Sequence, residues 1–218
     1  MTKSLLGSGV YDTGEVARLL GERVVRIVAW ATPAGYHGSA IVAPSLGWAF
    51  SFVDLVSLAV VRELSKRNVA EADLRSGVAF LKERTGIPHP LADRATVERL
   101  ATSGKAWLAD LDDGWCDIAK RGQGAFDEVV RLYLKRVSYD DLGVARLWRP
   151  ARLVLLDPKI QAGVPCVEGT RVPTETIAAM VESDSVSAVA DEFDLTIRQV
   201  NAAVTFEAGL RAGRGIAA

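Results

Sequence analysis

Short amphipathic segments, each bounded by a capping residue or a glycine, constrain this chain to a fold built mainly from short helices. Residues 14–20 carry apolar side chains at helical spacing, with Thr13 predicted as the N-cap and Gly21 as the stop. A second helix is expected over residues 22–31, directly after that glycine. Two short helices that meet at a glycine are typical of a helix-turn-helix.

The next stretch, residues 32–48, is rich in glycine and proline and predicts a long loop, with residues 40–43 as a short strand. Helical periodicity returns in two further segments, and the middle of the chain predicts a hairpin, a helix and a strand. These elements are expected over residues 51–67, 70–84, 105–119, 126–136 and 143–148.

The C-terminal region predicts a strand at residues 154–156, followed by three helices. The first covers residues 175–182, Ser185 caps the second, and Thr196 caps a longer third. A capped short helix, a turn and a capped longer helix form a second helix-turn-helix pattern.

The fold class that follows is mainly α (α+β). We expect an N-terminal winged helix-turn-helix over residues 1–91, a short β-hairpin and helix region over 92–152, and a three-helix helix-turn-helix unit over 153–218. The glycine- and alanine-rich tail from residue 211 is expected to fray.

The net charge and its distribution are compatible with nucleic-acid binding but do not indicate it. The net charge is −1, and residues 151–218 hold six basic against nine acidic residues. No apolar run is long enough for a membrane span, and the first residues do not resemble a signal peptide. Only two cysteines are present. We therefore expect a cytoplasmic protein without a membrane partner.

The second predicted helix supplies the first set of candidate DNA-binding residues. Arg23 and Arg26 are three positions apart, so they share a helical face that could contact phosphates or guanine. Arg18 could reach the DNA backbone from the first helix, and Tyr36 and His37 could do so from the predicted wing. The alternative is that the two arginines only solvate a helix face.

The last helix supplies a second set. Arg198, Gln199 and Asn201 lie in its first turns, where a helix-turn-helix reads bases, and amide side chains pair well with adenine. Acidic residues between positions 191 and 194 would repel phosphates. Dimerisation or partner binding by this unit is the open alternative.

Catalysis is not expected. Four aspartates gather near residues 110–117, but they lie on a predicted turn, where aspartate is favoured for backbone reasons. His37 and His89 have no serine or cysteine nucleophile near them in sequence. No glycine-rich phosphate loop occurs, and we expect no cofactor and no metal site.

Two stretches resemble known families. The C-terminal motif resembles the bacterial DUF433 family, whose members are often antitoxins paired with a VapC-like ribonuclease of the PIN-domain class. It reads Asp157-Pro158, Gly163-Val164-Pro165 and Gly169-Thr170-Arg171-Val172-Pro173. The N-terminal residues 11–21 and 50–55 are similar to a MerR-type winged helix. The long dimerising coiled coil of MerR regulators is missing, which argues against an effector-sensing regulator.

The resemblance to antitoxins implies a surface that neutralises the acidic, metal-binding site of a toxin. Basic residues between the two helix-turn-helix units are the candidates, with one tryptophan as an interface anchor. They are Lys135, Arg136, Arg146, Trp148, Arg149 and Arg152.

The sequence thus predicts a homodimeric antitoxin that binds promoter DNA and a VapC-like toxin ribonuclease, and is not an enzyme. A stand-alone transcription regulator without a toxin and a pure protein-interaction scaffold remain open alternatives.

Overall fold

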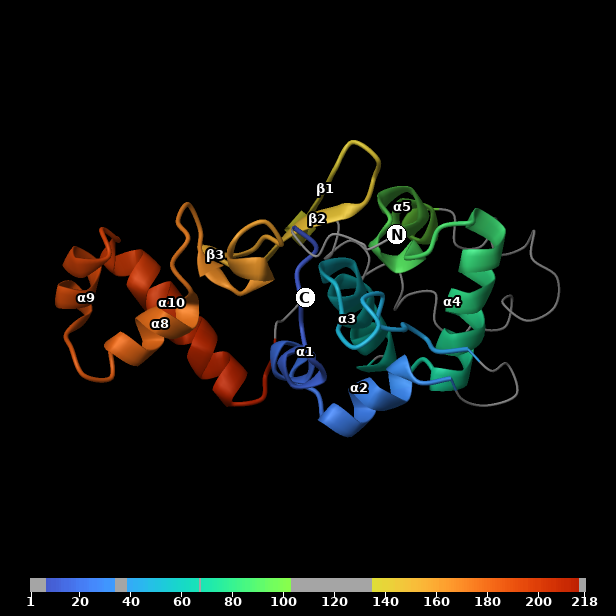
Figure 1. The fold of residues 1–218 in the computed structure, drawn as a ribbon, viewed down its shortest axis with the longest axis horizontal. Helices are drawn as coiled ribbons and strands as arrows, with labels where there is room; N and C mark the ends of the chain where they lie inside the picture. Colours follow the sequence, from blue (N-terminus) through green and yellow to red (C-terminus); the bar gives the residue numbers. More distant parts are fainter. Residues whose placement is uncertain (1–6, 34–38, 67, 103–134, 216–218) are drawn as a thin grey trace.

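The computed structural model describes residues 7–33, 39–66, 68–102 and 135–215. Within them the chain is mixed α and β and mostly helical, as predicted. Figure 1 shows helices α1 to α5 at one end of the molecule, α8 to α10 at the other, and a small sheet between them. The helices are α1 Thr13–Leu20, α2 Val24–Ala31, α3 Phe52–Lys66, α4 Glu71–Thr85, α5 Arg94–Thr102, α8 Thr174–Met180, α9 Val186–Glu192 and α10 Ile197–Arg211.

Helix α1 begins one residue earlier than predicted. Asp12, not Thr13, is the N-cap, and its side chain forms a reciprocal capping box with Glu15. The prediction of Thr13 as the cap was wrong because Asp-x-x-Glu satisfies two backbone donors, which a lone threonine cannot. Gly21 ends the helix in the left-handed conformation (φ 61°), as predicted.

Helix α3 forms the centre of the N-terminal half, and most of its residues are buried. The segment before it, residues 39–49, contains no strand, so the strand predicted over residues 40–43 is wrong. Tyr11 instead pairs with Phe50 in an isolated β-bridge. The short 3-10 turn Pro90–Ala92 contacts both α3 and α4.

The sheet has four antiparallel strands in sequence order. They are β1 Val137–Tyr139, β2 Ala145–Ala151, β3 Val154–Leu156 and β4 Cys166–Val167. The strand predicted over residues 154–156 is confirmed, and the one predicted over 143–148 lies slightly later, as β2. The predicted hairpin at 105–119 and nearly all of the predicted helix at 126–136 lie outside the described residues.

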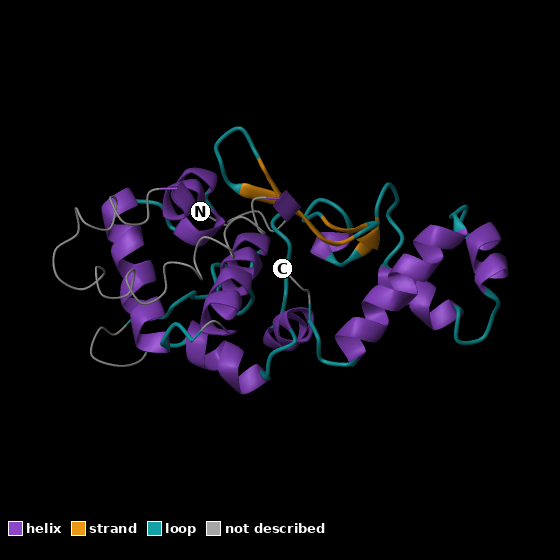
Figure 2. Ribbon diagram, turned by 180° about the vertical axis from the view of Figure 1, so that it is seen from behind, coloured by secondary structure: helices purple, strands orange, loops and turns teal. Residues whose placement is uncertain are grey.

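The three C-terminal helices follow the predicted pattern. The Ser185 side chain caps α9, and Thr196 caps α10. Figure 2 shows α10 running from this helical group back toward the N-terminal helices. Apolar side chains of α8, α9 and the first half of α10 form a small core of their own with Val167 of β4.

A larger core joins the N-terminal helices to the sheet and to Leu210 at the end of α10. Polar contacts also connect the N-terminal helices to the C-terminal part of the chain. The Tyr11 hydroxyl donates to the Gly163 carbonyl at 2.8 Å, and a Cβ at position 163 would collide with that hydroxyl. Arg62 donates to the Arg214 carbonyl at 3.0 Å, so the described part of the tail, predicted to fray, is attached to α3 at Arg214.

Strands β2 and β3 pair across residue 152, the predicted start of the C-terminal domain. The sheet therefore belongs to both neighbouring regions, and the boundaries at residues 91 and 152 stay a prediction.

Candidate functional site

The outward face of α2 is apolar. Val24, Val25 and Val28 are 51%, 63% and 47% exposed, while Ile27 and Trp30 point into the core. Arg23 lies at the N-cap of the helix and is exposed, with no charged partner among the described residues. The surface predicted to enter DNA is thus a valine face with one arginine at its start.

Arg26 is held against neighbouring helices. Its guanidinium donates to Ser65 Oγ at 2.6 Å and to Glu22 Oε2 at 3.3 Å, and lies 3.6 Å from Glu71 Oε1. The same group stacks over the Trp30 ring, 5.0 Å from its centroid. Four interactions within the fold leave little of this guanidinium to meet a phosphate.

Arg18 is also engaged within the fold. Its Nη1 lies 3.1 Å from Oε2 of Glu207 on α10, whose side chain is only 3% exposed. Glu207 Oε1 accepts a 2.5 Å hydrogen bond from the Thr174 hydroxyl. Arg18, predicted to contact the DNA backbone, thus links α1 to α10 and α8. Tyr36 and His37 lie outside the described residues.

The residues predicted to read bases from α10 fall into two groups. Arg198 and Asn201 are exposed on one face of the helix. Gln199 completes a capping box, with its Oε1 accepting from the Thr196 backbone at 2.9 Å, and its Nε2 donates to the Glu168 carbonyl at 3.3 Å. The Thr-x-x-Gln spacing could have shown from sequence that this glutamine caps its own helix.

The residues predicted to bind a partner lie on or beside strands β1 and β2, and all except Trp148 are at least partly exposed. Arg149 Nε lies 2.7 Å from Glu168 Oε1, and Arg136 donates to the Pro150 carbonyl at 2.9 Å. Arg152 is exposed in the turn between β2 and β3, and Lys135 is exposed before β1. Trp148 is fully buried (0% exposed), so it stabilises the core and cannot anchor a partner from the surface.

Two surface hollows meet at the β2–β3 turn. One, of about 430 Å³, is lined by Arg136, Arg149 and Glu168. The other, of about 650 Å³, is lined by Arg198, Asn201 and Phe206 of α10. Both include Arg152 and Leu153 of the turn.

We call this area the basic surface. It comprises Arg136, Arg149, Arg152, Arg198 and Asn201. The structure thus brings residues predicted for a partner protein beside residues predicted for DNA. Sequence spacing could not show this, because Arg149 and Arg198 are far apart in the chain.

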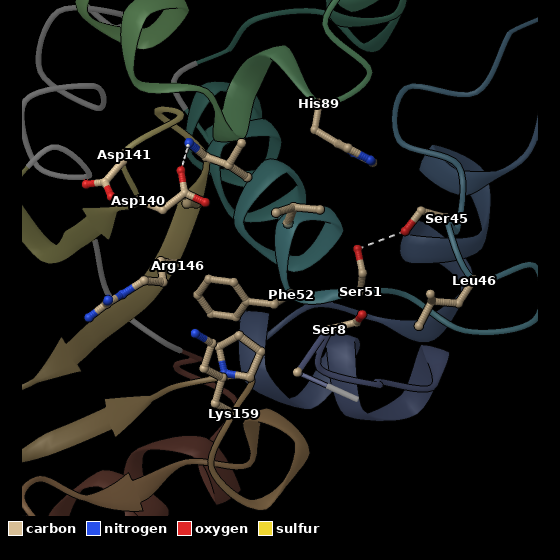
Figure 3. Close-up of a pocket in the computed structure, with 15 residues that line it drawn as sticks. Ser8, Ser45, Leu46, Ser51, Phe52, His89, Asp140, Asp141, Arg146 and Lys159 are labelled. Carbon is tan, nitrogen blue, oxygen red and sulfur yellow. Dashed lines mark hydrogen bonds between the residues drawn. The ribbon is translucent and has the colours of Figure 1, made fainter. Parts of the chain in front are cut away.

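A third hollow, of about 620 Å³, lies between the start of α3 and the β1–β2 hairpin (Figure 3). Arg146 and Lys159 line one side, and Asp140 and Asp141 come from the hairpin. Arg146 therefore belongs to this hollow and not to the basic surface. Positive and negative side chains line the same wall, so neither sign of charge dominates in this hollow.

A buried carboxylate lies beneath this hollow. Asp54 is fully buried, and its Oδ1 is 3.2 Å from Nδ1 of His89. Its Oδ2 accepts hydrogen bonds from the hydroxyls of Ser45 (2.6 Å) and Ser51 (2.8 Å). Burial alone would raise the pKa of Asp54, but the hydrogen bonds from His89 and the serines outweigh it and lower that pKa.

This cluster does not form a nucleophile–base pair. Both serine hydroxyls donate to the carboxylate, and His89 Nδ1 lies 3.2 Å from the other carboxylate oxygen, so neither serine is hydrogen-bonded to His89. Sequence motifs do not indicate this grouping because His89 is distant in the chain from Ser45 and Ser51. Within the described ranges, no group of three or more His, Cys, Asp or Glu side chains could hold a metal ion.

Comparison with known proteins supports the C-terminal resemblance. Residues 154–206 match the model of a family described as "Protein of unknown function (DUF433)". The match starts at β3 and ends within α10, so it contains Arg198 and Asn201 and excludes Arg136, Arg149 and Arg152.

Two further similarities extend beyond this segment. The chain is 26% identical to "Putative antitoxin VapB45" of Mycobacterium tuberculosis over 166 residues, covering 70% of this chain and 69% of the relative. The fold is similar to the crystal structure of Rv2018 from Mycobacterium tuberculosis, with a TM-score of 0.71 and 22% identity. That similarity covers 91% of this chain and 99% of the other.

No helix in the described part of the chain is long and apolar enough to cross a membrane.

Proposed function

We propose that this protein is the antitoxin of a type II toxin–antitoxin pair, which neutralises a VapC-like PIN-domain ribonuclease by direct binding and represses its own operon. The observation that carries this proposal is the similarity to a protein named as an antitoxin, which extends over 70% of this chain. The DUF433 match adds support from the C-terminal region.

The toxin-binding half of the proposal is supported by the basic surface. A toxin that binds catalytic metal ions needs carboxylates, and arginine pairs with carboxylates through two parallel hydrogen bonds. Arg152 is exposed at the centre of this surface and has no charged partner in the described part of the chain. It is our candidate for the strongest contact with the toxin.

The DNA-binding half depends on α1 and α2 as the helix-turn-helix of a winged domain. Arg23 is exposed at the start of α2 and can meet a phosphate, and the exposed valines can contact thymine methyl groups. A homodimer would present two copies of α2 to a palindromic operator.

The test is co-expression with the protein encoded by the adjacent reading frame. We expect a stable complex and restored growth of cells that make the neighbouring protein, together with a gel shift on the upstream DNA. A gel shift without a complex would instead identify a stand-alone regulator. If neither a complex nor a gel shift is observed, the protein would be a protein-interaction scaffold.

Two matched variants test the DNA-binding half of the proposal. Arg23→Ala should weaken operator binding and reduce its salt dependence, whereas Arg84→Ala, on the exposed face of α4, should change neither. Equal affinity of both variants would remove α2 from the DNA interface.

A further inference from the structure

The turn between β2 and β3 has an unfavourable residue at its centre. Leu153 has a φ of 61°, in the left-handed region that favours glycine or asparagine. Its carbonyl accepts a hydrogen bond from the Glu168 amide at 2.9 Å, which holds the turn in this shape. Backbone strain of this kind clusters at binding and active sites, which makes the Leu153 side chain a candidate for a contact with a partner.

The Leu153 side chain lies where the two hollows of the basic surface meet. Ala151, Ala202 and Phe206 also line the larger hollow, so apolar groups accompany the arginines there. Phosphate groups gain nothing from such apolar groups, whereas a protein segment with an apolar side chain does.

The charges around the hollows are unbalanced. Glu168 is the only acidic residue among those that line them, and its carboxylate is paired with Arg149. Arg152 and Arg198 are exposed and have no carboxylate partner among the described residues. The surface therefore presents at least two guanidinium groups that can still donate hydrogen bonds to carboxylates of a partner.

We propose that the basic surface docks a carboxylate-rich segment of a partner protein, with an apolar side chain of that segment against Leu153 and Phe206 and its carboxylates on Arg152 and Arg198. This rests on the proposed function, since it identifies the part of the antitoxin that holds the toxin. It also moves Arg198 and Asn201 from the DNA interface to the protein interface. The apolar groups that line the larger hollow, among them Phe206, fit a protein segment better than a DNA backbone.

Two labelled peptides test the surface on the full-length protein without knowledge of the toxin. One alternates glutamate with leucine, and the other alternates lysine with leucine. We expect the protein to bind the glutamate peptide, with affinity that falls as salt rises, and to bind the lysine peptide much more weakly.

Charge reversal locates the binding. Arg152→Glu together with Arg198→Glu should weaken glutamate-peptide binding by about tenfold or more, and Arg84→Glu on α4 should not. Equal binding by both variants would overturn the proposal. Loss of duplex DNA binding in the double variant, with peptide binding unchanged, would also overturn it and return the surface to nucleic acid.

Leucine 153 supplies a test that separates folding from binding. Leu153→Gly and Leu153→Asn relieve the left-handed conformation, so the urea midpoint should not fall. Peptide affinity should nevertheless fall about threefold to tenfold because the apolar contact is lost. Unchanged affinity in both variants would refute the role of this side chain.

The same variants separate this inference from the proposed function. If the wild-type protein forms a complex with the neighbouring gene product and the double charge reversal forms it equally well, the docking surface is wrong while the antitoxin function stands. If no complex forms with the wild-type protein, the antitoxin function fails, and the peptide results still decide what the surface binds.

Discussion

The pair between Arg18 and Glu207 joins the two ends of the chain, and its removal should be costly. Glu207 is 3% exposed in its side chain and has two polar partners, the Arg18 guanidinium at 3.1 Å and the Thr174 hydroxyl at 2.5 Å. Arg18→Ala would leave a carboxylate buried at the contact of α1, α8 and α10 with only the hydroxyl to stabilise it.

The size of the effect follows from the exposure of both partners. Breaking a fully buried ion pair costs about 3–5 kcal/mol, because the remaining charge is uncompensated. The Arg18 side chain is 37% exposed, so water can enter when it is removed and screen part of the charge. We therefore expect Arg18→Ala to lower the free energy of unfolding by about 2 kcal/mol.

Urea unfolding followed by tryptophan fluorescence measures this loss. The double variant Arg18→Ala with Glu207→Gln serves as the control, since it removes the buried charge and keeps an acceptor for Thr174. It should recover about 1 kcal/mol relative to Arg18→Ala. A loss below about 0.5 kcal/mol in Arg18→Ala would show that the pair does not stabilise the fold. If operator affinity fell in that variant while stability did not, Arg18 would be a DNA contact instead.

Three further outcomes are expected. Trp148→Ala should lower the free energy of unfolding by about 3–5 kcal/mol, because it empties a fully buried site, and a loss typical of surface residues would contradict its core position. The folded-state pKa of Asp54 lies below its ordinary value near 3.8, so its contribution to stability is present above that pH and is lost as the pH falls through the lower folded value. Urea midpoints between about pH 6 and pH 3 should therefore fall less steeply for Asp54→Asn than for the wild-type protein, and parallel curves would refute this. Burial raises the pKa of Cys166 to about 11, so in a Cys116→Ser background the remaining thiol should react slowly with a disulfide reagent at about pH 8 until urea is added. Rapid reaction of the folded protein would contradict that burial.

The parts of the fold that sequence predicted correctly are those decided by near neighbours. The caps of α9 and α10 and the glycine stop of α1 depend on residues within four positions of each helix end. The capping boxes of Asp12 with Glu15 and of Thr196 with Gln199 are equally local, and their Asp-x-x-Glu and Thr-x-x-Gln spacing indicates a cap in place of Thr13 and a capping role for Gln199.

The tertiary structure alone decided which residues meet and which remain exposed. An arginine has the same sequence signature whether it pairs with a buried glutamate 189 positions away, as Arg18 does, or extends from a turn, as Arg152 does. Trp148 became a core residue because β2 turns that position toward the N-terminal helices. The amino-acid sequence by itself determined most of the helices, the caps of α9 and α10 and the C-terminal motif, whereas α5 was not expected from it. Only the packing of distant segments determined the basic surface, since the charges that form it come from the sheet and from α10.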